Sequence, residues 1–409
     1  MNKRMLIVVA AALVMLGASA MPAAAEDKAP ASAPASKPAP TTAKTPGMIV
    51  SDRTMQDITD AEAAMKQQWK QETASAGNAR HVSGSYTDFN DLVWRYSLTL
   101  PAKVAPGAKY PLFVGQNQAI ALAMPSSQVE YPCYVLNCYC PDGFELKWPD
   151  WKSVTASAYK AVIEKLIAQY PNIDTARISV QGASRFGAIS FISAYNYPDT
   201  YAAIMPSVGG TDISKARLIA SRKIGIWMFY GVLDGGTVEA QLQKTPHGRG
   251  SPHIYKALRD AGYEPMLTVY THGEHHEYGF TDSLTNPDWN DFTLLRKWLF
   301  AQKKPTPTWP IITSPTTALG IVGKPFSYAI TASNAPKSFN AVLTIEHAET
   351  ASGTIETPKE NLPPDLSFDP KTGVISGTPR TAGRFFITLA ATNDNGTGIT
   401  TLALTVKGE

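Results

Sequence analysis

A serine stands between two glycines where an apolar, β-rich run gives way to a helical one. The segment is ARISVQGASRFGAISFISA, residues 176–194, and it places Ser184 between Gly182 and Gly187. A serine at such a turn can act as a nucleophile, because glycine relieves crowding there and N–H groups at the helix start stabilise a developing oxyanion. The backbone N–H of Arg185 is then one oxyanion donor. The alternative is an ordinary tight turn.

A serine hydroxyl needs a base, and the base needs an orienting acid. Asp234 ends the strand-like run IGIWMFYGVLD, and His275 follows the strand-like run PMLTVYT in the sequence THGEHH. The order serine, acid, histidine is that of α/β sheets with a nucleophile turn, whose sites lie at the carboxyl ends of strands. We therefore predict Ser184 as nucleophile, Asp234 as acid and His275 as base, with His276 as the reserve base. Asp234 could instead cap the next helix, a role that Thr237 could also fill.

The same histidine-rich segment contains side chains of the types that bind metals. HGEHHEYG, residues 272–279, holds three histidines and two glutamates. Imidazole and carboxylate groups are metal ligands, but the spacing is not H-E-x-x-H and the segment is typical of a loop. We predict no metal and no cofactor.

Strands and helices alternate from about His81 to Gln302. LVWRYSLTL, residues 92–100, alternates as a half-exposed antiparallel strand does, whereas YPLFVG, RISVQG and IGIWMFYGVLD are short apolar runs typical of a buried sheet. Helices are predicted over residues 155–169, 251–261 and 288–302. This alternation predicts an α/β, doubly wound, mostly parallel sheet.

An amphipathic helix is predicted ahead of this domain. Met55, Ile58, Met65 and Trp69 share one helical face, and Ser51 is a possible cap. We expect that face to pack on the domain that follows.

The amino terminus resembles a secretory signal followed by a linker. Lys3 and Arg4 precede an apolar run that is too short to span a bilayer, and small residues follow up to residue 25. Residues 26–47 are rich in alanine and proline, a composition that cannot bury a core. We expect a signal peptide over 1–25, a linker over 26–47, an α/β domain over 48–305 and a β domain over 306–409. The protein is then secreted or periplasmic, with no membrane contact after cleavage.

Charge gives no indication of a nucleic-acid partner. The formal net charge is +3, and two of the positive charges lie in the predicted signal, so the mature chain is nearly neutral. Three cysteines, Cys133, Cys138 and Cys140, lie close together. We interpret them as small apolar residues of a strand and its turn, although one disulfide among them is conceivable.

After Lys304 the helical pattern ends and a β pattern begins. Phe385, Ile387, Leu389 and Ala391 alternate along one strand, and a turn at residues 393–396 leads into another. The phrase LSFDPKTGVISGTPRTAG resembles the bacterial immunoglobulin-like repeat. Leu366, Asp369, Thr372, Gly373, Ile375, Gly377, Thr378 and Pro379 hold the matching places. The resemblance implies a small β-sandwich that serves as a spacer or contacts a polymer or cell surface.

Residues 111–302 resemble the secreted esterase and predicted-peptidase branch of the α/β-hydrolase superfamily, which includes feruloyl and acetylxylan esterases and polyhydroxybutyrate-depolymerase-like enzymes. IDTARISVQGAS resembles the phrase before their nucleophile, and FYGVLDGGT resembles their acid loop, with Tyr230 where histidine is usual. ALRDAGYEPMLTVYTHGEHH resembles their histidine loop. The resemblance implies the same triad of Ser184, Asp234 and His275.

The chain departs from this family around the oxyanion site. Phe186 occupies the usual place of the second glycine, and GASRFG is in this respect similar to the motif of glucuronoyl esterases, which implies that the Arg185 side chain also holds the oxyanion. The family's H-G-x-G loop is VGQNQA here, where Gln116 or Asn117 could supply an N–H. Phe186 could also line a substrate pocket.

These patterns together predict a secreted serine esterase. The resemblance implies an ester substrate, either a small molecule or a polysaccharide carrying acyl or methyl esters. Two alternatives stay open at this point. One is a serine peptidase of the same fold, and the other is a non-catalytic surface binding or adhesion protein with a degenerate hydrolase domain.

Overall fold

The computed structural model describes residues 47–76, 80–115, 120–141, 151–211, 215–244, 250–276, 292–343 and 362–408. The predicted signal peptide and all but the last residue of the predicted linker lie outside these ranges. No helix in the described part of the chain combines the length and hydropathy that a bilayer-spanning segment needs.

Nine strands of the described residues form one sheet, in the order β1-β9-β8-β7-β6-β4-β5-β3-β2. Only β3 runs antiparallel to its neighbours, and every other neighbouring pair is parallel. The strands are β1 (Met48–Ser51), β2 (His81–Thr87), β3 (Val93–Thr99), β4 (Tyr110–Gly115), β5 (Tyr134–Tyr139), β6 (Ile173–Ala183), β7 (Ala203–Ser207), β8 (Gly225–Gly231) and β9 (Met266–Tyr270).

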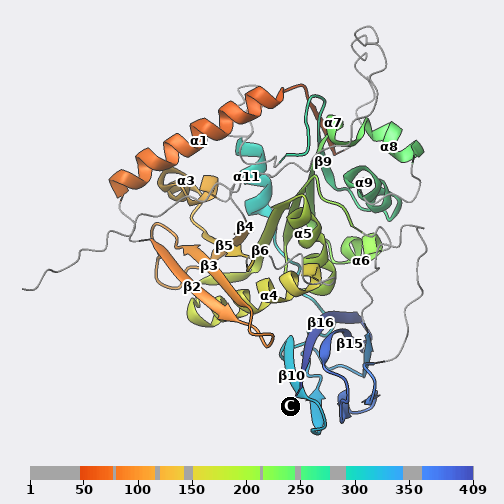
Figure 1. Cartoon of the computed structure of the whole chain (residues 1–409). Coiled ribbons are helices and arrows are strands. Elements are labelled where there is room, and N and C mark those ends of the chain that lie inside the picture. Colours follow the sequence, from red (N-terminus) through yellow and green to blue (C-terminus); the bar gives the residue numbers. More distant parts are fainter. Residues whose placement is uncertain are drawn as a thin grey trace, which may run out of the picture. The chain divides into compact units, whose positions relative to one another are not determined.

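Helices cover both faces of this sheet (Figure 1). One face carries α4 (Trp151–Gln169), α5 (Arg185–Asn196), α6 (Ala216–Ser221) and α9 (Ser251–Asp260). The other carries α1 (Met55–Ala76), α2 (Ile120–Ala123), α3 (Pro125–Glu130) and α11 (Phe292–Ala301). Successive residues of a strand point to opposite faces, so Leu112 and Val114 enter the first core and Phe113 the second. The doubly wound, mostly parallel α/β sheet is confirmed.

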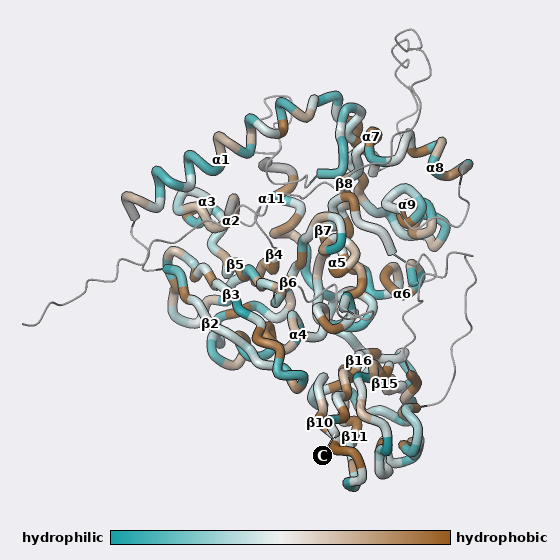
Figure 2. The backbone as a smooth tube through the Cα atoms, in the orientation of Figure 1, coloured by the Kyte–Doolittle hydropathy of each residue, from teal (hydrophilic) through white to brown (hydrophobic). Residues whose placement is uncertain are grey.

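Helix α1 buries the face that its sequence pattern indicates. Ile58 and Met65 are buried in the second core, with Met55 and Trp69 packed at its margin. Hydrophilic residues make up much of α1 (Figure 2).

The predicted cap of this helix at Ser51 is wrong. Ser51 ends β1, opposite Tyr270 of β9. Thr54 caps the helix instead: its Oγ1 accepts the Asp57 N–H at 3.2 Å, and the Asp57 carboxylate accepts the Thr54 N–H at 2.8 Å. This is a reciprocal capping box, with aspartate as its acidic member.

The C-terminal part is a β-sandwich, as predicted. Its four-stranded sheet has the order β10-β16-β15-β12 and its three-stranded sheet the order β11-β14-β13 among the described residues. The strands are β10 (Thr317–Ile321), β11 (Phe326–Ala329), β12 (Ser338–Leu343), β13 (Leu366–Asp369), β14 (Val374–Gly377), β15 (Gly383–Asn393) and β16 (Gly396–Lys407). The pair Asn393–Gly396 closes the expected hairpin.

The phrase shared with the immunoglobulin-like repeat builds a turn in this sandwich. Asp369 accepts hydrogen bonds from the Lys371 N–H at 2.9 Å and the Thr372 hydroxyl at 2.8 Å. Gly377 has a φ of +149°, and a Cβ there would lie 2.0 Å from the Asp365 carbonyl oxygen. Packing and turn geometry thus account for this motif.

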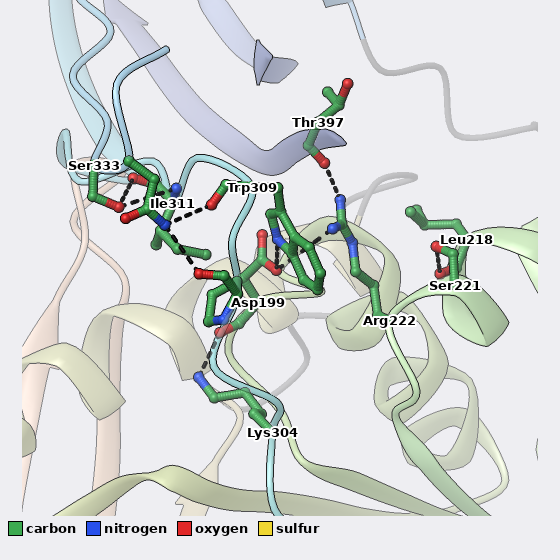
Figure 3. Close-up of polar contacts among 11 residues, drawn as sticks. Asp199, Leu218, Ser221, Arg222, Lys304, Trp309, Ile311, Ser333 and Thr397 are labelled. Carbon is green, nitrogen blue, oxygen red and sulfur yellow. Dashed lines mark hydrogen bonds and ion pairs between the residues drawn. The ribbon is translucent and has the colours of Figure 1, made fainter. Parts of the chain in front are cut away.

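A largely buried cluster of charged residues joins the sandwich to the α/β domain (Figure 3). Asp199 accepts a hydrogen bond from the Trp309 indole at 3.1 Å, and its backbone carbonyl accepts one from the Lys304 ammonium at 2.5 Å. The Arg222 guanidinium stands 4.7 Å from the centre of the Trp309 ring and donates to the Thr397 carbonyl. Asp199 precedes β7 and Arg222 precedes β8, so this contact lies at the amino ends of parallel strands.

A second, apolar contact joins the same two domains. Phe386 of β15 packs with Trp94, Val154 and Ala158, and only 7% of it is exposed. The neighbouring residue Phe385 points to the opposite face of the strand and packs against the core of the sandwich. Both faces of β15 are therefore covered, one by its own domain and the other by the α/β domain.

Candidate active site

Ser184 occupies the turn between β6 and α5 in a conformation that few residues adopt. Its φ is 55° and its ψ is −119°, outside the regions that side-chain-bearing residues normally populate. The Ser184 N–H donates to the Ser207 carbonyl at 2.9 Å. A Cβ on Gly182 would lie 2.4 Å from the Phe186 carbonyl oxygen. Glycine before the serine is therefore a steric requirement of this turn.

The second glycine of the motif serves a different contact. A Cβ on Gly187 would lie 2.9 Å from both the Gly209 Cα and the Ser207 carbonyl oxygen. Helix α5 consequently approaches the chain after β7 backbone to backbone. This approach explains why glycine stands at 187, while Phe186 can occupy the place where the family usually has glycine.

The structure brings Ser184, His275 and Asp234 together in one hydrogen-bonded row. His275 Nε2 lies 2.7 Å from Ser184 Oγ, and His275 Nδ1 lies 2.9 Å from Asp234 Oδ1. The three residues follow β6, β9 and β8, all at the carboxyl edge of the sheet. The side chains of His275 and Asp234 are 52% and 27% exposed. Their roles as nucleophile, base and acid stay predictions.

Asp234 does not cap the helix that follows it. It lies in α7 (Val232–Gly235), whereas α8 (Val238–Lys244) is capped by Thr237, whose Oγ1 accepts the Ala240 N–H at 3.1 Å. Tyr230, at the place where the resemblance expects histidine, donates from its hydroxyl to the Gly236 carbonyl at 2.9 Å. Burial and, to a lesser degree, the charge of Asp234 raise the pKa of Tyr230 to about 12. The hydroxyl of the neutral Tyr230 thus bonds the two ends of the acid loop to each other.

The histidine loop packs directly on the acid loop. The Leu233 N–H donates to the Gly273 carbonyl at 2.8 Å. A Cβ on Gly231 would lie 2.4 Å from the Glu274 carbonyl oxygen, so glycine is required at the end of β8. Acid and base are therefore fixed to each other by backbone contacts as well as by their side chains.

His276, the predicted reserve base, is directed elsewhere. Its Nε2 lies 2.7 Å from Glu62 Oε1 on α1, and its backbone carbonyl accepts the Ser207 hydroxyl at 3.1 Å. His276 as an alternative partner of Ser184 is therefore corrected: His275 holds that place. His272 is exposed.

The oxyanion side of the site is described only in part. Arg185 opens α5, and its guanidinium lies 5.8 Å from the centre of the neighbouring Phe186 ring. Phe186 is half-buried and packs against the core. Gln116 and Asn117, the candidates for the second N–H donor, lie outside the described residues.

Sequence reasoning missed two residues that contact this site. Ser207 is fully buried, and it bonds both the nucleophile turn and the histidine loop. Glu62 belongs to the amino-terminal helix, far from the site in sequence. Neither residue stands in a motif, and only the pairing of β6 with β7 and the packing of α1 bring them here.

Metal-binding geometry is not found in the described part of the chain, where no three His, Cys, Asp or Glu side chains gather closely enough to hold an ion. Glu277 of the histidine-rich segment lies outside that part. The three cysteines are free thiols, with Cys133 and Cys138 buried and Cys140 partly so. Burial raises the pKa of the Cys133 thiol to about 12. Cys133 and Cys138 are thus small buried residues, as predicted, whereas Cys140 is only partly buried.

Comparison with known proteins identifies the C-terminal domain. Residues 309–407 match the family model described as "Putative Ig domain", which confirms the resemblance found in the sequence. The chain matches none of the curated proteins with which it was compared.

Solved structures similar to this chain include two esterases and a peptidase. A thermostable esterase is 25% identical with a TM-score of 0.43, and the match covers 55% of this chain and 64% of that one. A ferulic acid esterase is 12% identical with a TM-score of 0.40, covering 53% and 98%. An acylaminoacyl peptidase is 15% identical with a TM-score of 0.41, covering 56% and 42%. The chain thus spans less than two thirds of the thermostable esterase.

The α/β domain therefore combines a mostly parallel sheet, a strained serine at the end of a central strand and a histidine between that serine and an aspartate. This is the fold of an α/β-hydrolase, with a serine, a histidine and an aspartate in hydrogen-bonding order at the carboxyl edge of its sheet.

Proposed function

We propose that this chain hydrolyses carboxylic esters through an acyl-enzyme. The observation that carries the proposal is the pair of contacts at His275, 2.7 Å to Ser184 Oγ and 2.9 Å to Asp234 Oδ1. An imidazole in that position accepts the serine proton at Nε2 while its Nδ1–H donates to the carboxylate, which stabilises the imidazolium that forms.

In the first half-reaction the Ser184 oxygen bonds to the ester carbonyl carbon, and its proton passes to His275 Nε2. The tetrahedral oxyanion collapses, the bond to the alcohol oxygen breaks, and His275 returns the proton to the leaving alcohol. In the second half, water attacks the acyl-serine with His275 again as base, and the carboxylic acid leaves. We assign the backbone N–H of Arg185, at the start of α5, as one donor to the oxyanion.

For the substrate we propose acyl or methyl esters on polysaccharides, and we propose that the protein is exported. The substrate class is supported by the resemblance of residues 111–302 to secreted esterases, and export by the signal-like first 25 residues. The sandwich would then contact a polymer or a cell surface.

A fluorophosphonate probe, with p-nitrophenyl acetate as substrate, tests the reaction. We expect labelling and turnover in the wild type, and Ser184→Ala to remove labelling and to lower turnover by at least about 10³-fold. Ser221→Ala, which alters a serine hydroxyl bonded within α6, is the matched control and should behave as the wild type. Circular dichroism should show both variants folded.

Equal labelling of the wild type and Ser184→Ala would remove Ser184 as the nucleophile. Absence of both labelling and turnover in the wild type would favour the non-catalytic binding protein. A peptidase of the same fold is separated by a parallel assay with p-nitroanilide amides, on which the proposal expects turnover far below that on esters.

A further inference from the structure

The segment that carries His275 is held from several sides. At its start, the Thr271 N–H and hydroxyl donate to the Ser51 carbonyl at 2.8 and 3.2 Å. In its middle, the Gly273 carbonyl accepts the Leu233 N–H at 2.8 Å. These contacts fix the backbone before His275, but they leave the residue after it to be fixed by other groups.

That residue is His276, and it is anchored twice. Its carbonyl accepts the buried Ser207 hydroxyl at 3.1 Å, and its Nε2 lies 2.7 Å from Glu62 Oε1. Ser207 also accepts the Ser184 N–H at its own carbonyl. Ser207, the last residue of β7, therefore bonds both His276 and the nucleophile turn.

Glu62 is itself well placed to hold an imidazole. It lies one residue after Ala61 and three before Met65, both buried, so the packed face of α1 sets its position. Its side chain is 21% exposed, and Lys66 lies 3.6 Å from its second oxygen. Burial alone would raise the pKa of Glu62, but the hydrogen bond and charge of His276 and the charge of Lys66 outweigh burial and hold the pKa below its usual value. The carboxylate is thus charged at neutral pH.

We infer that Glu62 is a positioning residue for the catalytic base, and that it acts through His276. Adjacent residues share a peptide plane, so a hydrogen bond that fixes His276 also limits the directions in which the half-exposed His275 ring can turn. The ring must meet Ser184 and Asp234 at once, and a small misplacement of a reacting group costs much of the rate. This inference rests on the proposed function, because His275 must act as the base.

The Glu62→Ala variant removes the anchor, and Glu62→Gln keeps an oxygen that can accept the His276 N–H. We expect Glu62→Ala to lower kcat on p-nitrophenyl acetate by about ten- to a hundredfold with KM within about twofold, and Glu62→Gln to recover most of the loss. If Glu62 acts only through His276, the double variant Glu62→Ala/His276→Ala should be no slower than His276→Ala alone.

Glu72→Ala is the matched control on the same helix. Glu72 joins α1 to the start of α3 through the Ser126 N–H and hydroxyl, both at 2.8 Å, without contacting the histidine loop. We expect Glu72→Ala to lower the melting temperature as much as Glu62→Ala does, with kcat unchanged. Equal losses of kcat in the two variants would show that α1 acts only through stability, and would overturn the inference.

A spectroscopic measurement separates this inference from the proposed function. The proton shared by His275 Nδ1 and Asp234 should give a far-downfield NMR resonance that needs no substrate. We expect it in the wild type, Glu72→Ala and Glu62→Gln, and expect it broadened or lost in Glu62→Ala. An unchanged resonance together with unchanged kcat in Glu62→Ala would refute the positioning role while Ser184→Ala still tests the hydrolase. A sharp resonance in an inactive wild type would instead refute the proposed function.

Discussion

Lys304 gives the sharpest test of the charged cluster at the junction between the two domains. Its N–H donates to the Ala176 carbonyl at 2.9 Å, and its ammonium donates to the Asp199 carbonyl at 2.5 Å. Burial lowers the pKa of Lys304 from 10.5 to about 8, although the charge of Asp199 opposes the fall. Such a fall corresponds to at most about 3 kcal/mol in favour of the neutral amine.

The sign of the effect follows from proton linkage. Between about pH 8 and pH 10.5 the unfolded chain keeps the Lys304 proton and the folded chain has lost it, so the stability of the folded state rises with pH. Below that window the full cost of the buried charge is present. Lys304→Met replaces the ammonium by an apolar chain of similar length, and it removes this dependence.

Urea unfolding at several pH values from about 7 to 10.5 measures the effect. The free energy of unfolding of the wild type, minus that of Lys304→Met, should increase by up to about 3 kcal/mol across the window. Tyrosine and cysteine titrations are common to both proteins and cancel in the difference. A difference that stays constant with pH would show that the ammonium is solvated, and one that falls would show that the charge of Asp199 outweighs burial. Either result would refute the reasoning.

Two further variants test packing. Gly187→Ala places a methyl group 2.9 Å from Gly209 Cα and should lower the free energy of unfolding, measured in urea, by about 1–3 kcal/mol. It should also lower kcat, because the nucleophile turn must shift. Wild-type stability would contradict the close approach. Phe386→Asp buries an unpaired charge against Trp94 and should lower the melting temperature by several degrees. Assayed well below the melting temperature, kcat should be preserved. An unchanged melting temperature would mean that the contact does not form in solution.

The mostly parallel sheet and the row at His275 could be anticipated because they depend on local signals. An apolar run followed by a polar residue marks the carboxyl end of a buried strand, and Ser184, Asp234 and His275 each stand at such a point. The sequence favoured His275 over His276 only through the resemblance of this segment to the family's histidine loop. In the structure their rings meet different partners, Ser184 for one and Glu62 for the other.

Residues buried by other elements gave no such signal. Phe386 stands on the face of β15 that alternation assigns to solvent, and it is buried only because another domain covers it. Ser51 does not cap α1 because it ends a strand of four residues, and the pairing of so short a segment with β9 cannot be predicted from the sequence. Periodicity detects the core of a domain and is silent on what neighbouring elements add.

The candidate catalytic residues and the contact between the two domains lie at opposite ends of the parallel strands. The catalytic candidates follow β6, β8 and β9, whereas the junction residues Asp199 and Arg222 precede β7 and β8. The length of the strands separates them, so a junction variant such as Lys304→Met should alter stability without altering kcat. Helix α1 is different, because Glu62 contacts the histidine loop itself. A rate that depends on Glu62 but not on Lys304 would show that the base is positioned by its direct neighbours and not by the contact between the two domains.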